Sequence, residues 1–130
     1  MIVGTGIDIV EVFRMRDAIS KWGDNFLTKV FTREEIKYSL SKRFAPQHFA
    51  ARFAAKEAVV KAFGEARKSP VNWTDIEVFN DKEGKPVISF SNEALKLKKR
   101  KNVSEVVVSM SHSKNYAVAS VILLKERGAK

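Results

Sequence analysis

The chain has 130 residues, of which 45% are hydrophobic and 30% are charged, and this is the composition of one globular domain with a modest core. It contains no cysteine, which excludes disulfides and thiolate chemistry and leaves oxygen and imidazole groups as possible metal ligands. The net charge of +9 indicates either an anionic partner or a highly charged surface that favours solubility.

No feature of the sequence divides the chain or directs it to a membrane. Internal repeats, low-complexity tracts and linkers rich in Pro, Gly or Ser are absent. The start, MIVGTGIDIV, lacks a basic leader, and no apolar run approaches the ~20 residues that span a bilayer. We expect a single domain over residues 1–130, located in the cytoplasm, with no membrane partner.

Residues 2–10 have the composition of a β-strand, with side chains alternating between two faces. The alternation places Gly4, Gly6 and Asp8 on one face, which has no side chain at the two positions preceding the aspartate on that face. Because glycines let another group approach the backbone closely, we expect a ligand or a metal ion at this face. Alternatively, the glycines mark a β-bulge and Asp8 caps the helix that follows.

Helices are expected next, over residues 11–22, 25–31 and 33–43, with Thr32 and Glu35 spaced as a capping box before the third. The first of these helices carries a group of basic residues soon after Asp8: Arg14, Arg16 and Lys21. They could steer an acidic partner toward Asp8, and Phe13 and Met15 would then form the desolvated centre of that interface. The alternative is a solvated basic face.

A long central helix is expected over residues 49–64, because the sequence FAARFAAKEAVVKAFG is rich in Ala and Gly64 suits a left-handed cap. At about 100° per residue, Phe53, Glu57 and Lys61 share one stripe of this helix. Apolar residues fill most other directions, and an unpaired carboxylate there would cost several kcal/mol. Glu57 therefore needs a cation, which is either Lys61 in an ordinary helix pair or a bound ion.

The last part of the chain predicts mainly strands. Residues 73–80 and 87–90 read as two strands around a turn, and Ser91 can cap a helix that reaches about residue 99. Residues 105–111 and 116–124 are Val-rich and predict an antiparallel hairpin. The fold class is therefore α+β. The basic run at 96–101 suits a solvated helix end, since no aromatic residue is interleaved with it for base stacking.

Three blocks in order, GTGID, FAAKEAVVKAFG and VVVSMSHSKNYAVASV, resemble the holo-acyl-carrier-protein synthase family, the small bacterial type of 4′-phosphopantetheinyl transferase. The most specific part is Lys56-Glu57-Ala58 followed by Lys61, with Gly6-x-Asp8 before it and Ser111-His112 near the end. The resemblance implies an antiparallel sheet packed around a long central helix, and a homotrimer with active sites at the subunit interfaces.

The resemblance also implies an activity, which is transfer of the phosphopantetheine arm of coenzyme A to a serine of an acidic apo-acyl-carrier protein in fatty acid biosynthesis. Adenosine 3′,5′-bisphosphate is released. Mg²⁺ would be held by Asp8 and Glu57, and Lys61 would stabilise charge on the pyrophosphate or orient Glu57. The base that takes the serine proton is Glu57, Asp8 or a water molecule. The carrier protein would bind Arg14, Arg16 and Lys21.

The resemblance places further residues at the coenzyme A nucleotide, namely Arg43, Arg52, Gly64, Pro86, Ser111, His112 and Ser113. His48 is expected to be an ordinary histidine without such a function. A different class of function is a basic nucleic-acid-binding module, in which Glu57 and Lys61 pair structurally and the run at 96–101 contacts phosphates. The transferase interpretation implies no nucleic-acid partner.

Overall fold

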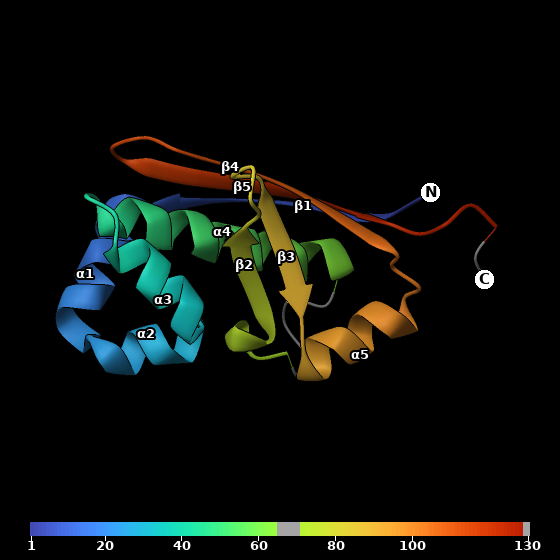
Figure 1. Cartoon of the computed structure of the whole chain (residues 1–130), viewed down its shortest axis with the longest axis horizontal. Coiled ribbons are helices and arrows are strands. Elements are labelled where there is room, and N and C mark those ends of the chain that lie inside the picture. Colours follow the sequence, from blue (N-terminus) through green and yellow to red (C-terminus); the bar gives the residue numbers. More distant parts are fainter. Residues whose placement is uncertain (65–70, 129–130) are drawn as a thin grey trace.

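A single long helix, α4 (Ala45–Phe63), runs through the middle of the fold, as the computed structural model shows (Figure 1). The structure describes residues 1–64 and 71–128. The other elements, in chain order, are β1 (Ile2–Glu11), α1 (Val12–Trp22), α2 (Asp24–Val30), α3 (Arg33–Leu40), a 3₁₀ turn (Trp73–Asp75), β2 (Ile76–Asn80), β3 (Pro86–Phe90), α5 (Asn92–Arg100), β4 (Glu105–His112) and β5 (Tyr116–Leu124).

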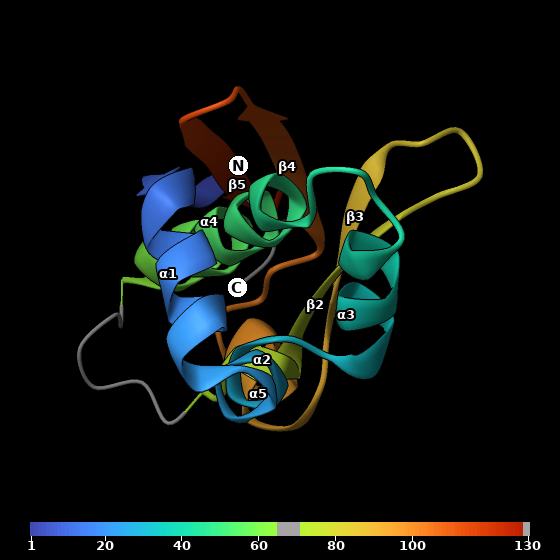
Figure 2. The same ribbon diagram turned by 90° about the vertical axis from the view of Figure 1, so that its left-hand side faces the viewer.

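The composition of α4 explains why it can occupy the centre. Pro46 lies in its first turn, where a missing N–H costs nothing, and Gly64 closes it with a left-handed φ of 78°. Small alanines at buried positions let strands and helices approach α4 from several directions. Figure 2 shows α1 on one side of α4, and α3 with the β2–β3 hairpin on the other.

The strands form two antiparallel sheets. The larger has the order β1-β5-β4 and packs against α4, and the smaller is the β2–β3 hairpin. The expected α+β class, the central helix and the antiparallel pairing of the last two strands are all confirmed. The resemblance implied one sheet, whereas the chain divides its strands between two.

The group that approaches Gly4 and Gly6 is the backbone of α4. A Cβ atom at Gly4 would overlap the carbonyl oxygen of Ala62, and one at Gly6 would overlap that of Ala58. The expectation of a ligand against these glycines is therefore wrong, because the helix already fills the space. Asp8, the next residue on this face, is held beside the last turns of the same helix, where its partner is Lys61.

Three local predictions also differ from the structure. The third helix ends at Leu40 instead of residue 43. Residues 73–75 form a 3₁₀ turn instead of the start of a strand, because Asn72 and Asp75 make a capping box there. Ser91 precedes α5 as expected, but its side chain makes no capping hydrogen bond. Within the described residues, no helix has the length and apolarity needed to span a membrane.

A buried ion pair joins α4 to the elements beside it. The ammonium group of Lys56 lies 2.6 Å from a carboxylate oxygen of Glu35 in α3, and both side chains are 0% exposed. Lys56 also donates to the carbonyl oxygens of Trp73 and Ile76, while Glu35 accepts from the backbone N–H groups of Thr32 and Val78. This satisfied network fixes α3, α4 and β2 relative to one another.

Candidate active site

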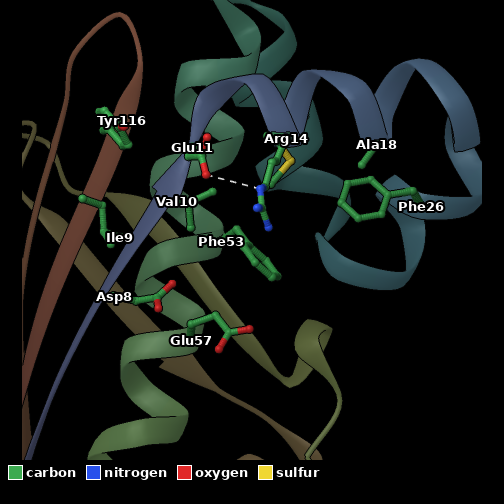
Figure 3. Close-up of a pocket in the computed structure, with 11 residues that line it drawn as sticks. Asp8, Ile9, Val10, Glu11, Arg14, Ala18, Phe26, Phe53, Glu57 and Tyr116 are labelled. Atoms are coloured by element: carbon green, nitrogen blue, oxygen red, sulfur yellow. Dashed lines mark ion pairs between the residues drawn. The ribbon is translucent and has the colours of Figure 1, made fainter.

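Asp8 and Glu57 line one cavity of about 490 Å³, to which β1, α1, α2 and α4 all contribute. Figure 3 shows the two carboxylates side by side at one end, with the ring of Phe53 next to Glu57. The remaining wall is largely apolar and includes Met15, Ala18 and Phe26. The cavity therefore combines two acidic groups with a surface that can exclude water.

Lys61 pairs with Asp8 across the contact between α4 and β1. Its Nζ atom donates to Asp8 Oδ1 at 2.8 Å and to the Ile7 carbonyl oxygen at 3.2 Å. Two alternatives from the sequence, a Glu57–Lys61 helix pair and an Asp8 helix cap, are therefore wrong. Lys61 makes no ion pair with Glu57 among the described residues, and Asp8 does not cap α1. The ammonium group is held near the cavity, yet 46% of the lysine side chain remains exposed.

Glu57 is half-buried and lacks an ion-pair partner within the described part of the chain. Burial raises the pKa of its carboxyl group, the negative charge of Asp8 raises this pKa further, and only the charge of Lys61 opposes them. The hydrogen bond to Asp8 raises the pKa of Lys61, so this lysine stays cationic. Because Lys61 pairs with Asp8, the negative charge of Glu57 is incompletely neutralised.

These donors suit a hard cation that is shared with a substrate. The described residues contain no group of three or more acidic, histidine or cysteine side chains that could hold a metal alone. Mg²⁺ is usually bound by one or two carboxylates, and its other positions are taken by water and phosphate oxygens. Asp8 and Glu57 fit such a site, in which Glu57 would gain the cation it lacks.

The basic residues of α1 do not share one surface. Arg14 lines the cavity and makes an exposed 3.3 Å pair with Glu11, and Lys21, two turns along on the same face, pairs with Asp17. Arg16 lies on another face, where it stacks over the exposed ring of Phe13. The expectation that Met15 sits at the centre of an exposed interface is wrong, because Met15 is buried in the core.

A second, smaller cavity of about 190 Å³ brings together three of the predicted nucleotide-contacting residues, Arg52, Pro86 and His112. Arg52 is only 2% exposed and stacks 3.9 Å above the ring of Tyr38. Its Nη2 atom donates to Asn80 Oδ1 at 2.7 Å, whereas its Nε atom has no hydrogen-bond partner among the described residues. A buried guanidinium with an unused donor is suited to a phosphate.

His48 also lines this second cavity, although the sequence suggested no function for it. Its ring lies edge-on to that of His112, with 4.8 Å between the ring centroids. The spacing of His48 and Arg52 on α4, four residues apart, was a signal that they share a face. Tyr38 and Asn80 could not be found in this way, because they come from separate elements.

The other predicted nucleotide-contacting residues lie outside this second cavity. Arg43 is exposed before α4 and stacks over Phe44. Gly64 caps the opposite end of the helix, and Ser111 and Ser113 are exposed on either side of His112. Their contacts with a ligand stay predictions.

The two groups of site residues lie on opposite faces of α4. At about 100° per residue, Arg52 is rotated roughly 140° from Glu57 and 180° from Lys61. Figure 2 shows the same separation, with α1 and the β2–β3 hairpin on opposite sides of the helix. The chain therefore carries the carboxylates and the buried arginine in two places that face away from each other.

Comparison with known proteins identifies the family. A model of the 4′-phosphopantetheinyl transferase superfamily matches residues 4–121. The chain belongs to this superfamily. The holo-[acyl-carrier-protein] synthase of Koribacter versatilis is 46% identical over 123 residues, which are 95% of this chain and 98% of that protein.

Solved transferase structures share the fold. The holo-[acyl-carrier-protein] synthase of Neisseria meningitidis matches with a TM-score of 0.88 and 32% identity, over 96% of this chain and 100% of that one. The enzyme of Bacillus anthracis, described in complex with CoA (3′,5′-ADP), matches with a TM-score of 0.80 and 37% identity, over 97% and 99% of the two chains. These matches favour the transferase interpretation over the nucleic-acid one, which also required a Glu57–Lys61 pair.

Proposed function

We propose that this transferase moves the 4′-phosphopantetheine group of coenzyme A to a serine of apo-acyl-carrier protein and releases adenosine 3′,5′-bisphosphate. The observation that carries the proposal is the cluster of Asp8, Glu57 and Lys61 at an open cavity. The relatives that match nearly the whole chain are named for this reaction, which supports it further.

In this reaction, the serine oxygen forms a bond to the phosphorus that carries the pantetheine arm. The bond from that phosphorus to the bridging oxygen breaks, and the electron pair leaves with the bisphosphate. Mg²⁺ held by Asp8 and Glu57 would supply neutralisation of the pyrophosphate charge. Lys61 is held by Asp8 and Ile7, and its ammonium group would stabilise charge on the leaving phosphate. The serine proton would pass to Glu57, to Asp8 or to a water molecule.

The nucleotide end of coenzyme A would bind in the second cavity. Arg52 would bind a phosphate with its guanidinium group, with Pro86 and His112 beside it. Arg43, Gly64, Ser111 and Ser113 complete the proposed set. Because this cavity and the carboxylates lie on opposite faces of α4, we propose that each active site combines the carboxylates of one subunit with the second cavity of its neighbour, in a homotrimer.

The acidic carrier protein would dock on the cavity side of α1. Arg14 lies at the edge of the cavity and Lys21 on the same helix face, so both could attract acidic side chains of the carrier toward Glu57. Arg16 points elsewhere and would contribute less. A cytoplasmic location stays a prediction from the sequence, and a function in fatty acid biosynthesis stays a prediction from the resemblance.

The reaction is tested by incubating the protein with coenzyme A, Mg²⁺ and an apo-acyl-carrier protein, and then measuring the mass of the carrier. We expect a gain equal to one phosphopantetheine group that requires Mg²⁺. Asp8→Asn should lose most of the activity, whereas Asp17→Asn, which removes an exposed carboxylate of α1, should keep it. A carrier whose mass does not change with the parent protein would refute the proposed activity.

Carrier docking is tested by a charge reversal on each face of α1. Arg14→Glu should raise the KM for the carrier protein much more than the KM for coenzyme A, and the effect should shrink at high salt. Arg16→Glu changes the charge equally but on the face away from the cavity, and it should have the smaller effect. Equal effects of Arg14→Glu on both KM values would contradict docking at this surface.

A further inference from the structure

His48 lines the second cavity, and the proposed reaction does not use it. Its imidazole packs between two rings, Tyr38 of α3 at 5.9 Å and His112 of β4 at 4.8 Å between centroids. Both contacts are edge-on, so they restrict the ring while leaving it at the wall of the cavity. His48 also lies one helical turn before the buried Arg52 and on the same face of α4.

The charged groups that face His48 are all potential cations. They come from α4 itself (Arg52), from the segment after α3 (Lys42) and from β4 (His112), while α3 contributes the neutral ring of Tyr38. The hairpin of β2 and β3 contributes uncharged lining residues, Asn80, Gly84 and Pro86. No carboxylate is among the described residues that line this cavity, and the nearby Asp81 is occupied by backbone N–H groups of its own turn.

This environment disfavours the charged form of the imidazole in the free protein. Burial lowers the pKa of His48 below its usual 6.5, and the charges of His112, Arg52 and Lys42 lower it further. A phosphate in the cavity would reverse the balance, because its negative charge stabilises the imidazolium and offsets the repulsion from the cations. Proton binding and anion binding at this place must then strengthen each other.

We propose that His48 takes up a proton when a phosphate of the nucleotide enters the second cavity, so that coenzyme A binds more tightly as the pH falls. This inference rests on the proposed function, since it takes the nucleotide of coenzyme A to be the ligand of this cavity. The coupling operates at pH values between those at which the free and the occupied sites titrate. There, one coupled proton changes the affinity by at most about tenfold per pH unit.

The direct measurement is calorimetry of adenosine 3′,5′-bisphosphate binding to the full protein, in two buffers of different ionisation enthalpy. The dependence of the heat on the buffer gives the number of protons taken up. The phosphates of the ligand themselves titrate near pH 6 and would release protons in a cationic cavity. The parent is therefore compared with His48→Gln, which keeps a polar side chain but cannot titrate, and with His48→Phe, which keeps the ring packing.

We expect the parent to take up more protons than either variant at neutral pH and below. The affinities of parent and variants should converge at alkaline pH, where His48 is neutral in both states, and differ several-fold near pH 6. Nucleotide binding with equal proton uptake in the parent and both variants would overturn this inference alone. Failure of the parent to bind the nucleotide at all would overturn the proposed nucleotide site as well.

Discussion

Lys61 could have a structural or a catalytic function, and the two predict different effects of replacing it. It bridges Asp8 and the carbonyl oxygen of Ile7, and nearly half of the side chain is exposed. Exposed ion pairs contribute only about 0–1 kcal/mol to stability. A lysine kept here only for the fold would therefore be replaceable at little cost.

We predict that Lys61→Met lowers kcat by about 10²-fold or more, because it removes a fixed cation from the position where charge grows on the leaving phosphate. The KM for coenzyme A should change less. Lys96→Met is the matched control, since Lys96 also forms an exposed pair, 3.1 Å from Glu93, but lies on α5. A kcat within a few-fold of the parent, in a folded variant, would show that Lys61 is structural.

Glu57 gives a prediction about stability and pH. Its folded-state pKa is raised above the usual 4.5, so the carboxyl group favours the folded state below pH 4.5 and this contribution is lost as the pH rises through the folded-state pKa. At neutral pH without metal, Glu57→Gln should therefore unfold at a temperature no lower than the parent, while losing transferase activity. The difference should narrow as the pH falls toward 4.5. Thermal unfolding with a chelator tests this, and a variant clearly less stable at neutral pH would contradict it.

Among the elements, α4 and α3 are joined by the fully buried Lys56–Glu35 pair. Breaking a buried pair from one side costs about 3–5 kcal/mol, because the remaining charge is left without compensation. Lys56→Met should lower the free energy of unfolding by about this amount, as urea denaturation would show. Lys37→Met, at an exposed position of α3, should change it by less than about 0.5 kcal/mol. A loss below about 1 kcal/mol for Lys56→Met would mean that the pair adds little.

The same elements show how far the sequence predicts the fold and the site. The central helix and the last hairpin were predictable, because each carries a long and consistent local pattern. The partners of Gly4 and Gly6 were not, since Ala62 and Ala58 lie more than fifty residues away in the chain and local patterns do not encode such contacts. For the same reason Lys56 drew attention only as a neighbour of Glu57, although its own partner is Glu35. The opposite placement of Arg52 and Glu57 was not predicted, although their spacing on one helix would have been enough to predict it.

One face of the β1-β5-β4 sheet carries exposed apolar side chains that the described residues of a single chain do not cover. The same alternation that turns the glycines toward α4 turns Ile7 and Ile9 outward, and each is 64% exposed. Neighbouring positions add Val107 and Tyr116, which are also exposed. Apolar sheet faces of this kind mark contact surfaces, which supports the proposed assembly of subunits.

We predict that the parent has about three times the 14.7 kDa mass of one chain in light scattering. Ile7→Glu should dissociate it, because a carboxylate would be buried in the interface, and activity should fall with the mass. Leu40→Glu places the same charge at a 61% exposed position of α3 and should leave the assembly intact. A parent that is monomeric and active would contradict the shared site.

The opposite faces of α4 also have a genetic consequence. If every active site takes Glu57 from one subunit and Arg52 from the next, a Glu57→Gln subunit and an Arg52→Met subunit are defective for different reasons. In trimers assembled at random from equal amounts of these two subunits, roughly a quarter of the interfaces would combine an intact Glu57 with an intact Arg52. Two gene copies that fail singly should thus complement each other when they are expressed together in one cell.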